Sequence, residues 1–172
     1  MKEFFIKNQR TYTTCTMKIL LLLVHFIPLI SNSIKIPNQV ICNFEIPYEV
    51  RNDLYKFLDE ASLTLPTTPV SVYETTNLYE FNKTTGMPYS VGGIYKDFII
   101  ILQPRDVLIK KGVFYKVLTH ELLHWVLYGL KEEYQEGLIY WWLKDYEKDE
   151  VDKFLDVFDG DLHKFIISNW KE

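Results

Sequence analysis

A stretch of good helix-forming residues from Thr119 to Trp125 carries His120, Glu121 and His124 in a His-Glu-x-x-His pattern. Residues four apart lie on the same face of a helix, so both imidazoles can bind one zinc ion. Glu121 is turned about 100° around the helix from His120, which suits it to deprotonate a zinc-bound water. A hydrolytic zinc site needs three protein ligands and a fourth position for water. Two histidines can also share a helix face by chance, so a third ligand is needed to decide.

A second helical stretch over residues 132–143 follows after a short connection. Gly129 is placed where a glycine would end the first helix, and a short link predicts antiparallel neighbouring helices. A carboxylate of the second helix would then face the two histidines. Glu132, Glu133 and Glu136 are the candidates, and Glu136 fits best because it lies one turn inside the helix.

The motif, followed by Glu136-Gly137 and an apolar, aromatic helix, resembles the gluzincin metallopeptidases, in particular their compact peptidase MA-like members. The resemblance covers about residues 90–143. It implies a zinc peptidase in which Glu121 is the general base for the attacking water. The zinc ligands that it implies are His120, His124 and Glu136.

The sequence departs from the family at two points. Many gluzincins have an acidic residue four positions after the ligand glutamate, where it orients a ligand histidine, and here that residue is Tyr140. No oxyanion donor is assigned either, although Tyr128, Tyr134 and Tyr140 all lie near the metal helices. These departures keep a second function open: a non-catalytic, zinc-stabilised binding or inhibitory module.

Other zinc peptidases share the His-Glu-x-x-His motif. Metzincins require a glycine and a third histidine where this chain has Leu127 and Leu130. Peptide deformylases need a cysteine ligand in a separate motif, and Cys42 lacks that context. Regulatory peptidases of the type that cleaves phage-type repressors share the strand–helix–helix order and remain an alternative, but they are cytoplasmic.

The chain has 172 residues, of which 48% are hydrophobic and 16% aromatic, enough for one globular domain with a sizeable core. Its net charge of −4 is uneven, because four basic residues and one acidic residue give residues 1–33 a charge of +3 and leave −7 for the rest. An acidic body argues against nucleic acid as a partner.

Residues 18–33 are typical of a targeting segment, with a lysine, an apolar run over residues 19–30 and small residues before a cut after Ser33. We expect residues 1–33 to be a cleaved signal peptide, or a membrane anchor through residues 19–30 if they are not cleaved. The domain, residues 34–172, is then secreted or extracytoplasmic.

Met17 is an alternative start that would give a compact signal peptide. The two cysteines, Cys15 and Cys42, predict no disulfide framework, because cleavage would remove Cys15. Cys42 is expected to be a buried, small apolar residue.

Apolar residues at helical spacing predict an amphipathic helix from Pro47 to about Leu63. Strands are expected near Val70–Glu74 and Leu78–Phe81, and a loop from Lys83 to Pro88.

Residues 91–95 and 98–102 predict a hairpin. Its second arm is apolar on both faces and therefore central, whereas the glycines of its first arm indicate an edge. In gluzincins an edge strand binds the extended substrate, so the resemblance makes Gly92 and Gly93 candidate substrate-binding residues. A bulge or turn is the simpler explanation of these glycines. Residues 103–112 are expected to connect the hairpin to the active-site helix, which begins at Val113.

Two short helices are expected at the C-terminal end, around Val151–Phe158 and Leu162–Trp170, as a cap on the metal helices. His163, in the second of them, is expected at the surface and not as a ligand. The prediction is an α+β, compact zincin-like domain with a small mixed or antiparallel sheet, a monomer whose cofactor is zinc and whose partner is a peptide or protein substrate.

Overall fold

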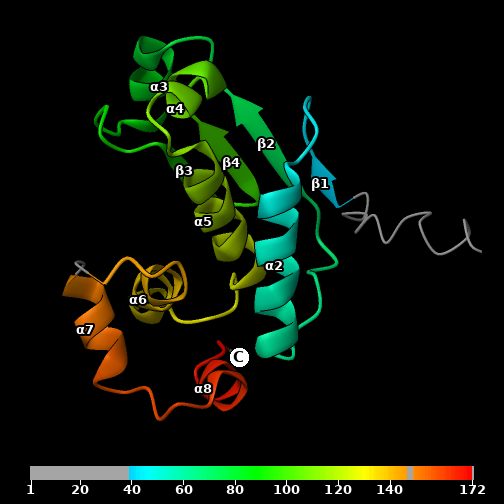
Figure 1. Cartoon of the computed structure of the whole chain (residues 1–172), viewed down its shortest axis with the longest axis vertical. Helices are drawn as coiled ribbons and strands as arrows, with labels where there is room; N and C mark the ends of the chain where they lie inside the picture. The colour runs from blue at the N-terminus through cyan, green and yellow to red at the C-terminus, as the bar shows by residue number, and fades with distance from the viewer. Residues whose placement is uncertain (1–38, 147–148, 172) are drawn as a thin grey trace, which may run out of the picture. The chain divides into compact units, whose positions relative to one another are not determined.

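The computed structural model describes residues 39–146 and 149–171 (Figure 1). In chain order the elements are β1 (Val40–Ile41), α2 (Tyr48–Glu60), β2 (Val70–Glu74), α3 (Leu78–Thr85), β3 (Gly93–Lys96), β4 (Ile99–Leu102), α4 (Arg105–Lys110), α5 (Phe114–Val126), α6 (Glu132–Trp142), α7 (Asp149–Leu155) and α8 (Leu162–Ser168). These seven helices and one small sheet of the described residues confirm the α+β class.

The predicted targeting segment, residues 18–33, lies outside the described residues, as do Cys15 and Met17. Among the described helices, none has the length and apolar character needed to cross a bilayer.

The four strands form a mixed sheet in the order β1-β2-β4-β3. β1, β2 and β4 run parallel to one another, and β3 runs antiparallel to β4. The predicted hairpin is confirmed, with β4 inside the sheet and β3 at its edge. Asp97 and Phe98 turn the chain with φ angles of 49° and 62°, the left-handed pair that a tight two-residue hairpin turn requires.

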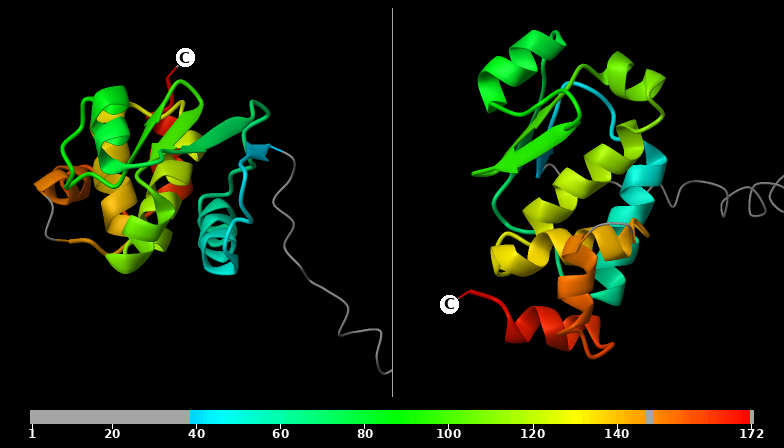
Figure 2. Two further views of the ribbon diagram at one scale, coloured as in Figure 1. Left: turned by 90° about the horizontal axis from the view of Figure 1, so that it is seen from above. Right: turned by 90° about the vertical axis from the view of Figure 1, so that its left-hand side faces the viewer.

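One face of the sheet is buried under α5. Val70, Val72, Ile100 and Leu102 point to this inner face and are at most 7% exposed. α5 packs on β3 and β4, and α2 packs beside α5 (Figure 2). Since Tyr95 pairs with Ile100, its side chain also belongs to the inner face and is directed toward α5.

α5 is held in the core by a broad apolar stripe. Its buried apolar residues are Phe114, Leu118, Leu122, Leu123, Trp125 and Val126. The indole nitrogen of Trp125 donates a hydrogen bond of 3.0 Å to the Thr68 carbonyl, which satisfies its only polar atom. His120 and His124 lie beside this stripe and stay partly exposed. The buried stripe therefore fixes the rotation of α5 about its axis. Both histidines lie beside the buried face and not within it.

The strand predicted near Leu78–Phe81 is wrong, because these residues begin α3. The Asn77 side chain accepts a hydrogen bond from the Glu80 backbone N–H and so caps the start of the helix. The spacing of apolar residues, on which the strand prediction rested, carries no information about this cap. The helix ends at Gly86, whose φ of 73° suits glycine. The loop predicted from Lys83 to Pro88 is accordingly helical up to Thr85.

The connection predicted over residues 103–112 contains α4, whose Arg105 N–H is capped by the Glu74 carboxylate at 2.8 Å. Gly129 does not end α5 in the left-handed conformation, since among the described glycines only Gly86, Gly112 and Gly160 have positive φ. A Cβ at Gly129 would instead meet the Trp170 indole, so glycine is needed there for close packing.

α5 and α6 are neighbours that cross at an angle, and α6 is seen nearly end-on in Figure 1. The C-terminal segment pins the link between them. Leu130 forms a bridge with Trp170, and the Lys171 N–H donates to the Gly129 carbonyl at 2.6 Å. These contacts hold the link between α5 and α6 in place.

The predicted C-terminal helices are confirmed, and α7 packs closely on α6. A Cβ at Gly137 would meet the Glu150 carbonyl and the Phe154 Cβ, so this glycine allows the two backbones to approach. Trp141, Phe154, Phe158 and Phe165 form a cluster of ring contacts with centroids 4.8 to 5.8 Å apart. α7 and α8 therefore buttress α6 on the side away from α5.

Candidate metal centre

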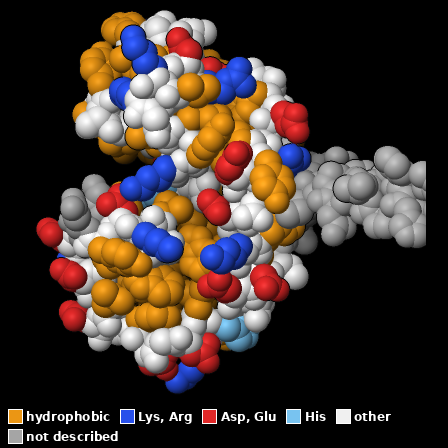
Figure 3. Space-filling model, viewed as in Figure 1, with side chains coloured by type: hydrophobic (Ala, Val, Ile, Leu, Met, Phe, Trp, Pro, Cys, Tyr) orange, Lys and Arg blue, Asp and Glu red, His pale blue; other side chains and the backbone are white. Residues whose placement is uncertain are grey.

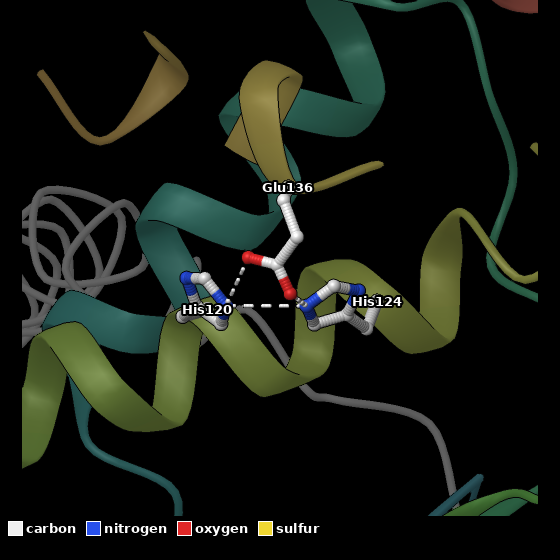
Figure 4. A group of neighbouring side chains, drawn as sticks. All are labelled: His120, His124 and Glu136. Carbon is white, nitrogen blue, oxygen red and sulfur yellow. Dashed lines mark hydrogen bonds and ion pairs between the residues drawn. The ribbon is translucent and has the colours of Figure 1, made fainter. Parts of the chain in front are cut away.

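His120 and His124 converge from successive turns of α5. Their Nε2 atoms are 3.1 Å apart, and the two side chains are 14% and 12% exposed. Two ring nitrogens at this separation point at a common place beside the helix (Figure 4). The predicted pairing of the two histidines is therefore present in the structure.

Glu136 reaches the same place from α6. Its Oε1 lies 3.1 Å from His124 Nε2, and its Oε2 lies 3.4 Å from His120 Nε2 (Figure 4). Glu132 and Glu133, the other two candidates, are exposed, and Glu132 pairs with Lys171 at 3.0 Å. Of the three carboxylates, the structure brings only Glu136 to the histidines.

These three residues fit a divalent metal ion. One ligand atom from each residue lies within 4.8 Å of the other two, and no second such group occurs among the described residues. Glu136 Oε2 is buried, and in the described part of the chain it has only the 3.4 Å approach of His120 Nε2. Two imidazole nitrogens and a carboxylate are a donor set that zinc accepts, and this weakly partnered oxygen has a lone pair for a metal ion.

The Glu136 carboxylate and the two imidazoles are electrostatically coupled. Burial raises the pKa of Glu136, but hydrogen bonds and charge from His120 and His124 outweigh it and hold that pKa well below the usual range. For His124, burial lowers the pKa, and the nearby Glu136 and Glu121 carboxylates raise it overall. Both shifts show that the carboxylate and the imidazoles interact strongly.

Gln135 fixes the orientation of His124, a role that the sequence did not reveal. The Gln135 Nε2 donates to the Leu130 carbonyl at 2.8 Å, which places its Oε1 3.0 Å from His124 Nδ1. An amide oxygen can only accept, so His124 Nδ1 carries the hydrogen and Nε2 keeps its lone pair for a metal. The only signal in the sequence is the position of Gln135 directly before the ligand glutamate.

Glu121 lies beside the cluster and under β3. Its side chain is 6% exposed, and a Cβ at Gly93 would lie 3.0 Å from its Cγ and 3.1 Å from its Oε1. Burial raises its pKa against the charges of the two histidines, and a hydrogen bond from the Tyr95 backbone also favours its ionised form. A carboxylate with a raised pKa, next to a metal site, suits proton transfer near neutral pH.

Aromatic rings enclose both histidines. Tyr95 stacks on His124 with centroids 6.2 Å apart and planes within 4°, and Tyr140 packs on His120 at 5.0 Å. Burial, followed by the charge of Glu136, raises the pKa of Tyr140 to about 12, so its hydroxyl stays protonated. Tyr134 faces Phe165 instead. Of the predicted tyrosines, Tyr140 lies nearest the histidines.

Gly92 and Gly93 lie along the cleft, at the point where β3 meets α5. A Cβ at Gly92 would lie 2.7 Å from a Val117 methyl group, and one at Gly93 would lie 2.9 Å from Leu102. Close packing therefore explains both glycines without a bulge. The Gly92 carbonyl also accepts a hydrogen bond from the Gln103 N–H. Substrate binding at these two residues stays a prediction.

Two hollows meet at the cluster and share Tyr95, His124 and Glu136. The Lys116 hollow, of about 610 Å³, extends along the start of α5 and is lined further by Met87, Ser90, Val91, Gly92, Gly93, Ile94, Lys116, Val117, His120, Glu121, Tyr140 and Asp145. The Tyr128 hollow, of about 620 Å³, extends past the hairpin tip and is lined further by Lys96, Asp97, Phe98, Tyr128, Glu132 and Gln135. Figure 3 shows the molecule deeply notched on its left side, where α5 passes between the β3 region and α6.

Two residues outside the cleft behave largely as expected. His163 is exposed and its Nδ1 lies 2.9 Å from the Ala61 carbonyl, so it ties α8 to the end of α2. Cys42 is a free thiol, half-buried, with its Sγ donating to the Phe44 carbonyl. Neither residue lines a hollow that reaches the cluster.

Comparison of the chain with protein-family models, with curated proteins and with solved structures found no match to any of them.

Proposed function

We propose that this protein is a zinc-dependent peptidase of the gluzincin type, built on a zincin-like fold. The observation that carries the proposal is the convergence of His120, His124 and Glu136 from two helices, with the Glu121 carboxylate buried beside them. Their order along the chain and their placement on α5 and α6 support the resemblance drawn from the motif.

In this proposal His120, His124 and Glu136 hold the zinc ion, which when bound supplies a Lewis acid that activates water for attack. Glu121 accepts the proton of the attacking water and delivers it to the leaving amine. The oxygen of the water bonds to the peptide carbonyl carbon, the C–N bond breaks, and a carboxylic acid and an amine result. Gln135 keeps the His124 ring in its binding orientation through the hydrogen bond at Nδ1.

The position of β3 supports an extended peptide as substrate. β3 pairs with β4 alone among the described strands, so its other edge carries backbone groups outside the ladder along the Lys116 hollow, where the Tyr95 backbone is bonded to Glu121. An extended chain can add to such an edge through backbone hydrogen bonds. Gly93 lies in this strand, and Gly92 directly before it, and both remain our candidates for substrate contact.

Two large hollows that open at the cluster support catalysis over a purely structural zinc site. A structural site is closed by four protein ligands, whereas a catalytic site keeps one position for water. The described residues offer three ligands here, and the remaining side of the cluster faces the cleft. A non-catalytic module would have no use for the buried Glu121 beside its metal. We also propose a secreted or extracytoplasmic location. It rests on the targeting segment predicted at residues 18–33, which lies outside the described residues.

The test compares Glu121→Gln with His120→Ala. The first change keeps the shape of the side chain and removes the base, so zinc stays bound while peptide hydrolysis falls by about 100- to 10,000-fold. The second removes a ligand, so zinc and hydrolysis are lost together. Zinc content and cleavage of a mixed peptide library are measured on the same preparations. Full turnover by Glu121→Gln would show that the assigned base is wrong.

A further inference from the structure

The metal-ligand cluster lies between two hollows of nearly equal size, not at the closed end of one. The Lys116 hollow and the Tyr128 hollow share His124 and Glu136, and each extends from the cluster in its own direction. With a volume of about 600 Å³ each, both have the size of a ligand pocket. A polypeptide bound over the cluster therefore has room on both sides of the reacting bond.

The charged side chains close to the cluster are already engaged. Lys116 pairs with Asp145 at 2.6 Å, and Glu132 pairs with Lys171 at 3.0 Å. Glu136 lies between the two histidines. A site that removes terminal residues needs a charged group next to the reacting bond to hold a free amine or carboxylate. Among the described residues that line the hollows, the one remaining carboxylate beside the cluster is Glu121, which is buried and is the proposed base.

The remaining charged side chains of the cleft lie away from the reacting position. Lys96 and Asp97 are exposed at the tip of the hairpin. Because Lys96 pairs with Ile99, its side chain belongs to the outer face of the sheet, away from α5. Neither residue is placed to select a chain terminus at the cluster.

The Tyr128 hollow has an aromatic wall. Phe98 packs on Tyr95 and on Tyr128, with ring centroids 6.4 and 5.5 Å apart, and Tyr128 packs edge-on against Trp170 at 5.7 Å. Tyr128 is nonetheless 48% exposed, so a large part of its surface is available to a ligand. Aromatic surface of this kind binds large apolar side chains.

We propose that the cleft accepts an internal segment of a polypeptide, distant from both chain ends, with an aromatic or large apolar side chain in the Tyr128 hollow. The proposal deepens and rests on the peptidase function, and makes the protein an endopeptidase. The reaction is the same hydrolysis, in which water adds to the carbonyl carbon and its proton passes to the leaving amine.

The test uses blocked peptides and the zinc-loaded protein. Two peptides of about ten residues, which at about 3.3 Å per residue extend beyond the cluster in both directions, are acetylated at one end and amidated at the other. One has a central phenylalanine and the other an alanine. Cleavage is followed by mass spectrometry beside the same peptides with free ends. Binding of fluorescein-labelled versions is measured by anisotropy with the Glu121→Gln protein.

We expect blocked and free peptides to be cleaved at equal rates, with kcat/KM about tenfold or more higher for phenylalanine than for alanine. Tyr128→Ala should remove most of this preference in cleavage and in binding. Tyr115→Ala is the matched control, since Tyr115 is a tyrosine of similar exposure, at 51%, and lines neither hollow. The Tyr115→Ala protein should keep the wild-type preference for phenylalanine over alanine.

Each other outcome decides a separate point. Cleavage of free-ended peptides alone would overturn the inference and leave the peptidase proposal intact. Cleavage of blocked peptides without a preference that depends on Tyr128 would overturn the aromatic subsite. Binding through Tyr128 with no hydrolysis by the wild-type protein would keep the cleft assignment and overturn the peptidase proposal. No binding and no cleavage would overturn both.

Discussion

The hydrogen bond between Gln135 and His124 gives the sharpest quantitative prediction. Gln135→Met keeps the approximate volume of the side chain and removes both its acceptor and its donor. His124 Nδ1 then loses its 3.0 Å partner, and the tautomer with a lone pair on Nε2 is no longer selected. Loss of such a supporting bond typically weakens metal binding by about 10- to 100-fold, or about 1.4 to 2.7 kcal/mol.

The same substitution should also destabilise the zinc-free protein. Gln135 is only 7% exposed, and it loses the 2.8 Å bond to the Leu130 carbonyl as well. Two buried hydrogen bonds at about 0.5 to 1.5 kcal/mol each give a loss of about 1 to 3 kcal/mol. Gln135→Glu separates the two effects: a carboxylate still accepts from His124 Nδ1 but cannot donate to Leu130.

The assay is competition for zinc against a chromophoric chelator, with urea unfolding of the zinc-free proteins beside it. Gln135→Met should lose both affinity and stability, and Gln135→Glu should lose stability while it keeps most of its affinity. A folded Gln135→Met protein with wild-type zinc affinity would refute the orienting role of Gln135.

Two further predictions follow from the packing and the metal site. Gly137→Ala places a Cβ against the Glu150 carbonyl and should lower the free energy of unfolding by about 1 to 3 kcal/mol or more. A wild-type free energy of unfolding in urea would refute the close α6–α7 contact. Removal of zinc by a chelator should lower the melting temperature, by an amount corresponding to about 4 kcal/mol when free zinc was 1,000 times its Kd. Added zinc should restore the original melting temperature, measured by calorimetry. A melting temperature that the chelator does not change would argue against a bound ion.

Local patterns in the sequence predicted several elements of the fold and the position of the third ligand. The apolar spacing of Val50, Leu54 and Phe57 predicted α2, and the all-apolar run of β4 predicted its central position in the sheet. These two predictions succeeded because the spacing of apolar side chains along an element shows which of its faces are buried. The placement of Glu136 opposite the histidines followed from its being one turn inside a helix close to the first.

Features that depend on distant contacts were not predictable in this way. Gly129 looked like a helix terminator, but its reason is the Trp170 ring, which comes from 41 positions further along the chain. The link between α5 and α6 is held by the C-terminal segment, through contacts such as the bond from Lys171 to Gly129. The role of Gln135 was missed because its contact with His124 depends on how α6 lies against α5. The strand predicted at Leu78 failed for a local reason, since the Asn77 cap outweighs a short apolar run.

The most direct test of the central claim is the zinc content of the purified wild-type protein beside Glu136→Ala and, as a control on the same helix, Glu133→Ala. We predict one zinc ion per chain in the wild type and in Glu133→Ala, which changes an exposed residue, and loss or marked weakening of binding in Glu136→Ala. No zinc in the wild type after metal-replete purification would contradict the metal centre. Full retention of zinc by Glu136→Ala would contradict the assigned third ligand, and with it the proposed gluzincin type.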